Sequence, residues 1–361
     1  MLQNKLKVMV VDDSALVREF MRQLISAQSD MEVVTASDPY MARDKMLKEM
    51  PDVIILDVEM PKMDGLTFLQ KVMNFRPIPV IMFSSVTRHG AEEAINAMSM
   101  GAVDVVAKPT QNIKVELNNL KDDLLNKIRA VAGKKVQKKT NLTAMQVTSK
   151  VDIDQLLPLK IPLRSKGPLV VLMGASTGGT DALEKVLLNL PANCPPIAIV
   201  QHMPENLTLA FANRLNSKCQ MNVFEAVDGQ QLPPGTCLIA PGGARHMFLE
   251  KDKSTGGYLV RLKEGPPVNR HRPSVDVLFR SGANSAGGNA LAIIMTGMGD
   301  DGAQGVKDLH DAGAMTVAQN EQTCVVYGMP KMAVQKGGVD RVVPLNDIAG
   351  VIKEQWIHAR G

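Results

Sequence analysis

The chain has 361 residues, of which 45% are hydrophobic and 22% are charged, and its formal net charge at pH 7 is +4. This length allows two or three domains with full cores, while the modest charge and the 3% of aromatic residues argue against a nucleic-acid-binding protein. We expect a cytoplasmic protein that is not embedded in a membrane, because no apolar run reaches the length of a transmembrane helix and no signal-peptide cleavage site follows the start. The four cysteines are too few for a disulfide scaffold and too widely spaced for a zinc motif.

Residues 6–131 alternate strand and helix patterns, which predicts a parallel sheet with helices on its faces. Four apolar runs in this region each end in polar or charged residues: 6–11, 53–56, 80–83 and 103–106. Open α/β sheets place their functional sites at the carboxyl ends of their strands. The residues that follow the four runs are Asp12, Asp13, Asp57, Ser84 and, one position further on, Lys108.

Three carboxylates at one sheet edge repel each other unless a cation neutralises them. Asp12, Asp13 and Asp57 are therefore predicted to hold Mg²⁺, which prefers carboxylate oxygens and water. The hydroxyl of Ser84 and the ammonium of Lys108 would complete a site for a phosphoryl group carried on one aspartate. A single acid at a strand end is more often a solvated loop residue, but five such residues at four strand ends favour a functional site.

The motifs KVMVVDDS, LDVEMPKMDG, MFSS and AKP resemble the response-regulator receiver domain. The resemblance implies a flavodoxin-like domain over residues 1–126 with a parallel five-stranded sheet. It further implies phosphorylation of Asp57 by a histidine kinase, with Mg²⁺ on Asp12 and Asp13 and phosphoryl contacts from Ser84 and Lys108. Many receivers have an aromatic residue three positions before the lysine, where this chain has Val105, so we do not expect an aromatic rotamer switch. The bond between Lys108 and Pro109 is a candidate cis peptide.

Residues 127–166 are predicted to be a linker. From Lys127 to Lys150 the chain carries seven basic residues and no acid, and its hydrophobic periodicity fades after Val131. A basic arm that binds nucleic acid is the alternative, but no DNA-binding motif accompanies it. Apolar character returns at residues 153–163, which we expect to pack onto the second domain.

The second domain is predicted to span residues 167–361, and it opens with the segment LVVLMGASTGGTDALEKVLLNL. Its first five residues are typical of a strand buried on both faces, and apolar residues recur at helical spacing from Thr180 onward. Ser176 therefore lies on a sharp strand-to-helix turn, in the G-x-S-x-G pattern of a nucleophile elbow. The amino end of the new helix would favour a developing oxyanion there.

The same turn could instead be a plain small-residue turn or a phosphate-binding loop. It lacks the third-position glycine of a dinucleotide fingerprint, where Ser176 stands, and no Gly-Lys-Ser/Thr follows as in a Walker loop.

Further strands are predicted at 197–200, 238–240, 291–295, 316–318 and 339–343, with a hairpin formed by 247–250 and 258–262. Together they indicate a second doubly wound α/β domain. Two of these strands lead into His202 and into the pair Asp300 and Asp301, so that a nucleophile, a base and an acid follow three strands, as in a Ser-His-Asp triad. The order Ser, His, Asp along the chain differs from that of α/β-hydrolases.

Three other histidines are alternative bases. His310 lies in a predicted helix and fits a surface position, whereas His246 follows APGGAR. His271 lies in the loop GPPVNRHRPSVD, which could instead bind a carboxylate.

The motifs GASTGGTDAL, QHMP, GPPVNRHRPSVDVLF, TGMGDDGA and QNEQTCVVYGMP resemble the chemotaxis protein-glutamate methylesterase family, and the match spans essentially the whole chain. The resemblance implies that Ser176 is the nucleophile, His202 the general base and Asp301 the orienting acid. It makes the backbone N–H of Met298 an oxyanion donor, with Thr177 as a neighbouring contributor.

The expected activity is hydrolysis of glutamate methyl esters on chemoreceptors, with glutamine deamidation by the same attack and no cofactor for the ester chemistry. An unphosphorylated receiver would cover the cleft of what we expect to be a monomer. Asp300 departs from the family, which often has asparagine there, and it could raise the pKa of His202 if it pointed inward.

The sequence disfavours two other functions. A transcription factor would need a helix-turn-helix or a cluster of basic residues on one helix, and neither is found in the sequence. A nucleotide-dependent oxidoreductase is disfavoured by the missing glycine pattern around Ser176.

Overall fold

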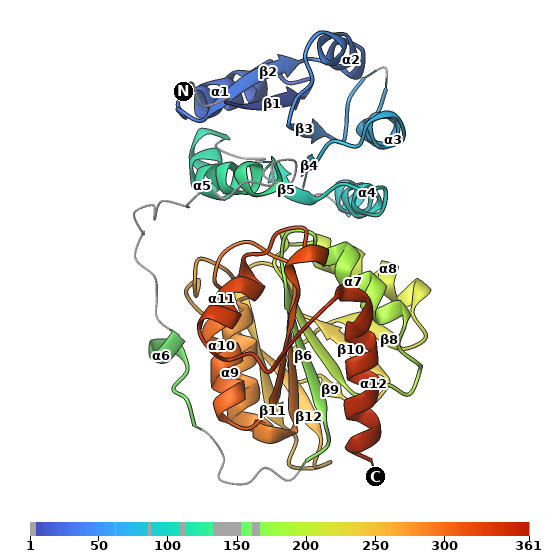
Figure 1. Cartoon of the computed structure of the whole chain (residues 1–361), viewed down its shortest axis with the longest axis vertical. Coiled ribbons are helices and arrows are strands. Elements are labelled where there is room, and N and C mark those ends of the chain that lie inside the picture. The colour runs from blue at the N-terminus through green and yellow to red at the C-terminus, as the bar shows by residue number, and fades with distance from the viewer. Residues whose placement is uncertain are drawn as a thin grey trace. The chain divides into compact units, whose positions relative to one another are not determined.

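The computed structural model describes residues 5–61, 63–85, 88–108, 113–132, 153–160 and 167–360. The chain divides into two compact units, residues 1–142 and 143–361 (Figure 1). Pro109, whose peptide bond was a candidate for the cis form, lies outside the described residues. No helix within the described ranges is both long and apolar enough to span a bilayer.

The first unit is built on a five-stranded parallel sheet with the strand order β2-β1-β3-β4-β5, as predicted. Its strands are β1 (Leu6–Val11), β2 (Met31–Ala36), β3 (Val53–Asp57), β4 (Val80–Ser85) and β5 (Asp104–Lys108). Its helices are α1 (Ala15–Ser26), α2 (Pro39–Lys48), α3 (Gly65–Phe75), α4 (Arg88–Ser99) and α5 (Ile113–Ala132). Strand β2 is not among the predicted strands, because it is an edge strand whose middle residues are only partly buried and give a weak hydrophobic signal.

Helices α1 and α5 pack together on one core. Ser14 caps α1 as expected, with its hydroxyl accepting a hydrogen bond from the backbone N–H of Val17 at 3.4 Å. Helix α5 runs to Ala132, so the predicted linker start at residue 127 is corrected. Ile128 and Val131 are fully buried in the core, and the ammonium of Lys127 pairs with Asp104 at 3.3 Å, which explains why the helix continues.

The second unit contains a seven-stranded parallel sheet with the order β15-β14-β13-β6-β7-β10-β8, a doubly wound arrangement. Its strands are β6 (Val170–Ala175), β7 (Ile197–Gln201), β8 (Asn222–Glu225), β10 (Thr236–Ile239), β13 (Ala290–Ile294), β14 (Met315–Gln319) and β15 (Arg341–Val343). The chain winds outward from β6 on one side and from β13 on the other. Doubly wound sheets place ligands beside such a switch point.

Two helical layers cover this sheet (Figure 1): α9 (Val275–Ser285), α10 (Ala303–Asp311) and α11 (Met329–Gln335) lie on one face, and α7 (Gly179–Leu188), α8 (Leu207–Lys218) and α12 (Ile348–His358) lie on the other. A separate antiparallel sheet contains β9 (Gln231–Leu232), β11 (Arg245–Lys251) and β12 (Tyr258–Glu264). The pairing of β11 with β12 confirms the predicted hairpin.

The chain that precedes the second sheet is anchored on the second unit. Helix α6 (Ile153–Leu156) places Ile153 against the buried side chains of Phe248 and Val277. The buried guanidinium of Arg280 reaches back to donate to Asp154 at 2.5 Å and to the carbonyl of Leu157 at 3.1 Å. Residues 153–160 therefore pack onto this unit, as the sequence predicted for the segment that begins at residue 153.

Candidate functional site

Three neighbouring strands of the second sheet bring the predicted catalytic residues to one edge. Ala175 at the end of β6 pairs with Gln201 at the end of β7, so Ser176 and His202 are the next residues on adjacent strands. The backbone N–H of His202 donates to the carbonyl of Ala175 at 3.1 Å, which holds the two strand ends together. Asp301 comes from the loop that follows β13, the neighbour of β6 on its other side.

Ser176 lies on the tight turn that its small neighbours predicted. The N–H of Gly179 donates to the Ser176 carbonyl at 2.7 Å, and Gly178 has a φ of +76°, a conformation that favours glycine. A side chain at Gly297 would lie 2.8 Å from the Cβ of Ser176, so the loop after β13 presses against the serine. Ser176 is consequently only 8% exposed.

The residues assigned to the oxyanion flank this turn. Thr177 is buried, and its carbonyl accepts a hydrogen bond from the hydroxyl of Thr296 at 2.9 Å. Met298 directly follows Gly297 and is half-buried. Both residues therefore belong to the two segments that meet at Ser176.

Asp301 accepts hydrogen bonds from several donors at the start of helix α9. Its carboxylate receives the hydroxyl of Ser274 at 2.7 Å and the backbone N–H groups of Val275 at 2.7 Å and Asp276 at 3.2 Å, in addition to Nε2 of His202 at 2.7 Å. Complete burial by itself would raise the pKa of Asp301, but the hydrogen bond and charge of His202, with help from Ser274, hold that pKa well below its usual value. Asp301 is thus an ionised acceptor for the edge of the histidine ring that carries Nε2.

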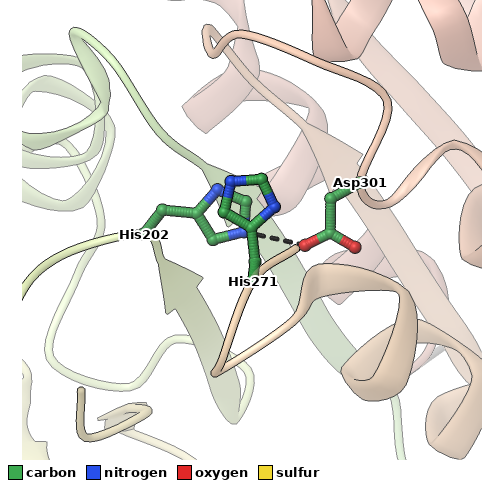
Figure 2. A group of neighbouring side chains, drawn as sticks. All are labelled: His202, His271 and Asp301. Atoms are coloured by element: carbon green, nitrogen blue, oxygen red, sulfur yellow. Dashed lines mark hydrogen bonds and ion pairs between the residues drawn. The ribbon is translucent and has the colours of Figure 1, made fainter. Parts of the chain in front are cut away.

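A second histidine covers the first. The rings of His202 and His271 are parallel, with their centroids 3.7 Å apart and 2° between their planes (Figure 2). With Nε2 committed to Asp301, the other ring nitrogen of His202, Nδ1, is buried and has no hydrogen-bond partner among the described residues. The stack restricts rotation of the His202 ring and so helps to maintain the contact between Nε2 and Asp301.

His202, His271 and Asp301 are also close enough to one another to suggest a metal site. Imidazole lone pairs lie in the plane of the ring, and two parallel rings therefore cannot direct them at one point. Nε2 of His202 is already bonded to Asp301. The geometry fits a hydrogen-bonded and stacked base, and it does not fit a metal centre.

The other alternative bases have different roles. His246 is fully buried and uses both ring nitrogens, since Nε2 donates to the carbonyl of Pro266 at 2.9 Å and Nδ1 accepts from the N–H of Ser274 at 3.1 Å. Burial lowers the pKa of His246, so it remains neutral. His310 lies on α10 and pairs with Asp340 at 3.1 Å at the surface.

Asp300, the acid at which the chain departs from the family, lies beside an arginine. Its carboxylate is partly exposed and lies 3.7 Å from the guanidinium of Arg270. Arg270 and its neighbour Asn269 both adopt a positive φ, and this backbone turn presents the arginine to Asp300. The guanidinium of Arg270 therefore offsets part of the negative charge of Asp300.

Two supporting residues were not singled out from the sequence. The amide Nε2 of Gln201 donates to the carbonyls of Ser176 at 2.9 Å and His202 at 3.1 Å, and so it links the Ser176 turn to the end of β7. No local pattern reveals that role. Ser274 could have been found, because Ser-Val-Asp before an apolar helical run is typical of a helix start.

The first unit gathers its predicted residues at the carboxyl edge of its own sheet. Asp12 and Asp57 are buried, Asp13 is exposed, and their carboxylates lie within 4.8 Å of one another. The ammonium of Lys108 pairs with Asp57 at 2.7 Å and with Asp12 at 3.0 Å. The hydroxyl of Ser84, also buried, donates to the carbonyl of Gly90 at 3.0 Å.

The electrostatics of this cluster favour a divalent cation. Burial and, next, the charge of Asp12 raise the pKa of Asp57 to about 6. Burial also raises the pKa of Asp12. One lysine does not compensate the acids, and three oxygen-bearing carboxylates are the donor set that hard divalent cations prefer. The cluster has the composition of a divalent metal site.

Known protein families match the sequences of both units. Residues 171–352 match the family model of the CheB methylesterase, and residues 8–118 match that of the response regulator receiver domain. A protein-glutamate methylesterase/protein-glutamine glutaminase 2 from Oleidesulfovibrio alaskensis is 51% identical over 350 residues, covering 96% of this chain and 97% of the relative. Its namesake from Hahella chejuensis is 49% identical over 356 residues, covering 95% and 94%. The crystal structure of the CheB methylesterase catalytic domain of Thermotoga maritima is 36% identical with a TM-score of 0.50, covering 52% of this chain and 99% of that one.

Proposed function

The chain belongs to the CheB methylesterase family, and on that premise we propose that Ser176, His202 and Asp301 are the triad of a phosphorylation-controlled protein-glutamate methylesterase. The enzyme hydrolyses the methyl ester of glutamate side chains on chemoreceptors and deamidates glutamine side chains. The catalytic assignment rests on one observation. His202 follows the strand that pairs with the strand before Ser176, and its ring is hydrogen-bonded to Asp301.

The first half of the reaction forms an acyl-enzyme. The oxygen Oγ of Ser176 attacks the ester carbonyl while Nδ1 of His202 takes the serine proton, because Nε2 is held by Asp301. Asp301 stabilises the imidazolium that results. The imidazolium then gives its proton to the leaving oxygen, the ester C–O bond breaks, and methanol departs; ammonia departs in the same way from glutamine.

In the second half of the reaction, water attacks the acyl-serine and His202 again takes the proton, which restores Ser176 and frees a glutamate carboxylate. The N–H groups of Met298 and Thr177 stabilise the oxyanion in both halves. Two features of the chain support this assignment: the turn before helix α7 and the close approach of Gly297 to Ser176.

The receiver unit supplies control. Asp57 accepts the phosphoryl group from a histidine kinase, forming an acyl phosphate, while Lys108 and Ser84 contact the phosphoryl oxygens. Asp12, Asp13 and Asp57 would hold Mg²⁺, which neutralises the charge of the acids and of the phosphoryl group when bound. Phosphorylation shifts the population toward an arrangement in which the receiver leaves the esterase site open.

The substrate side chains lie on the cytoplasmic helices of chemoreceptors, so the enzyme acts in the cytoplasm. It acts as a monomer, without nucleic acid and without a cofactor in the ester chemistry.

The decisive measurement is methanol release from methylated receptor membranes, with and without acetyl phosphate and Mg²⁺. We expect the activity of the full chain to rise with the phosphodonor, and Ser176→Ala to lose several powers of ten in rate under both conditions. Asp57→Asn should retain the basal rate and lose the increase. Ser217→Ala, which removes an exposed hydroxyl bonded to its own helix, is the matched control and should behave as the unaltered chain. Activity in Ser176→Ala would place the nucleophile elsewhere.

A further inference from the structure

Helices α2 and α3 leave an apolar groove between them on the receiver unit. Helix α2 packs on β1 and β2, whereas α3 packs on α4, and the groove between the two helices encloses about 370 Å³. That volume lies within the range of about 300–1,000 Å³ that is typical of ligand pockets. The apolar side chains that face it include Tyr40, Met46 and Leu47 from α2 and Phe68, Val72 and Phe75 from α3.

Two of these side chains are unusually exposed. Phe75 is 89% exposed and Leu47 is 80% exposed, which are the highest values among the large hydrophobic side chains of the described residues. A single exposed apolar residue needs no explanation, but these two line one groove from opposite helices. Contiguous apolar surface of this kind marks interaction sites.

All charged residues that line the groove are basic. They are Arg43 on α2, Lys71 on α3 and Arg76 at the end of α3. Arg43 also pairs with its neighbour Asp44 at 2.8 Å, but both side chains are more than half exposed and such a pair contributes little. An occupant of this groove therefore meets an apolar floor with a positive rim.

We propose that the α2–α3 groove is a docking site for an acidic amphipathic helix of a partner protein. Apolar residues at helical spacing would fill the floor beside Phe75 and Leu47, and flanking carboxylates would pair with the arginines of the rim. This inference is independent of the proposed esterase function, because none of the groove residues belongs to either site described above.

Charge and shape favour this occupant over others. A second copy of the chain would bring two positive rims together. The chain's own segment after α5, residues 133–150, carries five basic residues and no acid, so it is repelled as well. A bilayer is flat on this scale, whereas a concave groove between two helices fits the convex surface of a third helix.

The test is a binding measurement on the full chain with two synthetic peptides of about 15 residues, near the length at which isolated helices become marginally stable. One peptide carries leucine at i, i+3, i+4 and i+7 with glutamate at the flanking positions, and the other has lysine in place of each glutamate. Fluorescence anisotropy gives the affinities, and amide chemical shifts locate the contact. We expect only the acidic peptide to bind, more weakly at high salt, with shifts confined to α2 and α3.

Three variants test whether the acidic peptide binds in the α2–α3 groove. Phe75→Ser, Leu47→Ser and Arg76→Glu should each weaken binding of the acidic peptide by about tenfold or more, because buried anchors and arginines dominate such interfaces. Leu16→Ser removes a 54% exposed apolar side chain from α1 and should leave the affinity unchanged. The basal esterase rate and the circular dichroism of all four variants should match those of the unaltered chain, which shows that they fold.

Several outcomes would overturn the proposal. The first is that the acidic peptide fails to bind. The second is that it binds Phe75→Ser with the same affinity as the unaltered chain, and the third is that the lysine peptide binds with the same affinity as the acidic one. In a further outcome, the peptide fails to bind while the chain self-associates or binds anionic vesicles, and Phe75→Ser abolishes that association. Such a result would assign the groove to a second copy or to a membrane and would also refute the proposal.

Discussion

A buried aspartate stands at the carboxyl edge of a parallel sheet in each half of this chain, and the two aspartates have opposite surroundings. Asp57 ends β3 beside a second buried acid, and burial with that neighbour raises its pKa to about 6. Asp301 follows β13 and is fully buried, yet its pKa is lowered because His202, Ser274 and the start of α9 supply donors.

The difference follows from what each carboxylate has to do. Asp57 is proposed to accept a phosphoryl group, so its negative charge must remain available to a metal ion and to the incoming phosphorus. Asp301 is proposed to hold a histidine in one orientation and to stabilise its positive charge, so it must never protonate. Both aspartates lie at the carboxyl edge of a parallel sheet. The hydrogen-bond donors that surround each carboxylate decide whether its pKa is raised or lowered.

The largest effect is expected from Asp301→Asn. We expect its esterase rate to fall by about four powers of ten, because an amide cannot hold the same histidine tautomer or balance an imidazolium. The adjacent Asp300→Asn is the matched control, since Asp300 is partly exposed and lies near Arg270, and its rate should change by less than about threefold. Equal losses in the two variants, measured as methanol release, would show that Asp301 has no special role.

The same substitution should change stability in opposite directions in the two units. A raised pKa means that ionised Asp57 destabilises the receiver as pH rises from about 4 through 6. In EDTA at pH 7, Asp57→Asn should therefore stabilise the receiver by about 1–3 kcal/mol, whereas Asp301→Asn should destabilise the catalytic unit.

Urea unfolding followed by residue-specific amide exchange would separate the two transitions. Mg²⁺ should stabilise the unaltered receiver and have a smaller effect on Asp57→Asn, since a metal ligand has been lost. If Asp57→Asn lowered receiver stability in EDTA, the contrast between the two aspartates would be wrong.

Removing the stacked ring should give a smaller loss. His271→Ala frees one face of His202, and we expect kcat to fall roughly threefold to tenfold, as the loss of an aromatic contact of about 0.5–1.5 kcal/mol implies. His271→Phe restores a flat ring without a titratable nitrogen and should recover most of the rate with an unchanged pH profile. A full loss in His271→Phe would indicate that the His271 nitrogens take part in the reaction.

The smallest effect concerns His246, which stands behind Asp301 and shares Ser274 with it. Because its pKa is lowered from 6.5 by burial, its contribution to stability is complete above pH 6.5 and is lost as pH falls below that value. Thermal unfolding of the catalytic unit should become more acid-sensitive there, and His246→Gln, which keeps a donor and an acceptor, should remove that part of the pH dependence. An identical pH dependence in His246→Gln would show that the buried ring does not titrate as expected.

Local patterns in the sequence predicted most of the strands and the sheet edge at which the candidate functional residues lie. The apolar strand before Asp12 and the small-residue turn around Ser176 are both formed by consecutive residues. They can therefore be recognised from the local sequence alone. Parallel strands end at one edge, so residues that follow such runs come together without further information. The predicted linker start at residue 127 is too early, because the run of basic residues without an acid begins there, inside the last turns of α5 that bury Ile128 and Val131.

The pairing of these residues with one another depends on the folded chain. His202 and Asp301 are 99 residues apart, and no local pattern states that Nε2 of this histidine contacts the acid or that His271 covers its ring. The same holds for Arg270 beside Asp300 and for the donors that the start of α9 supplies to Asp301. Periodicity records which face of an element is buried, whereas the partner of each polar group depends on packing between distant segments, and that packing exists only in the folded chain.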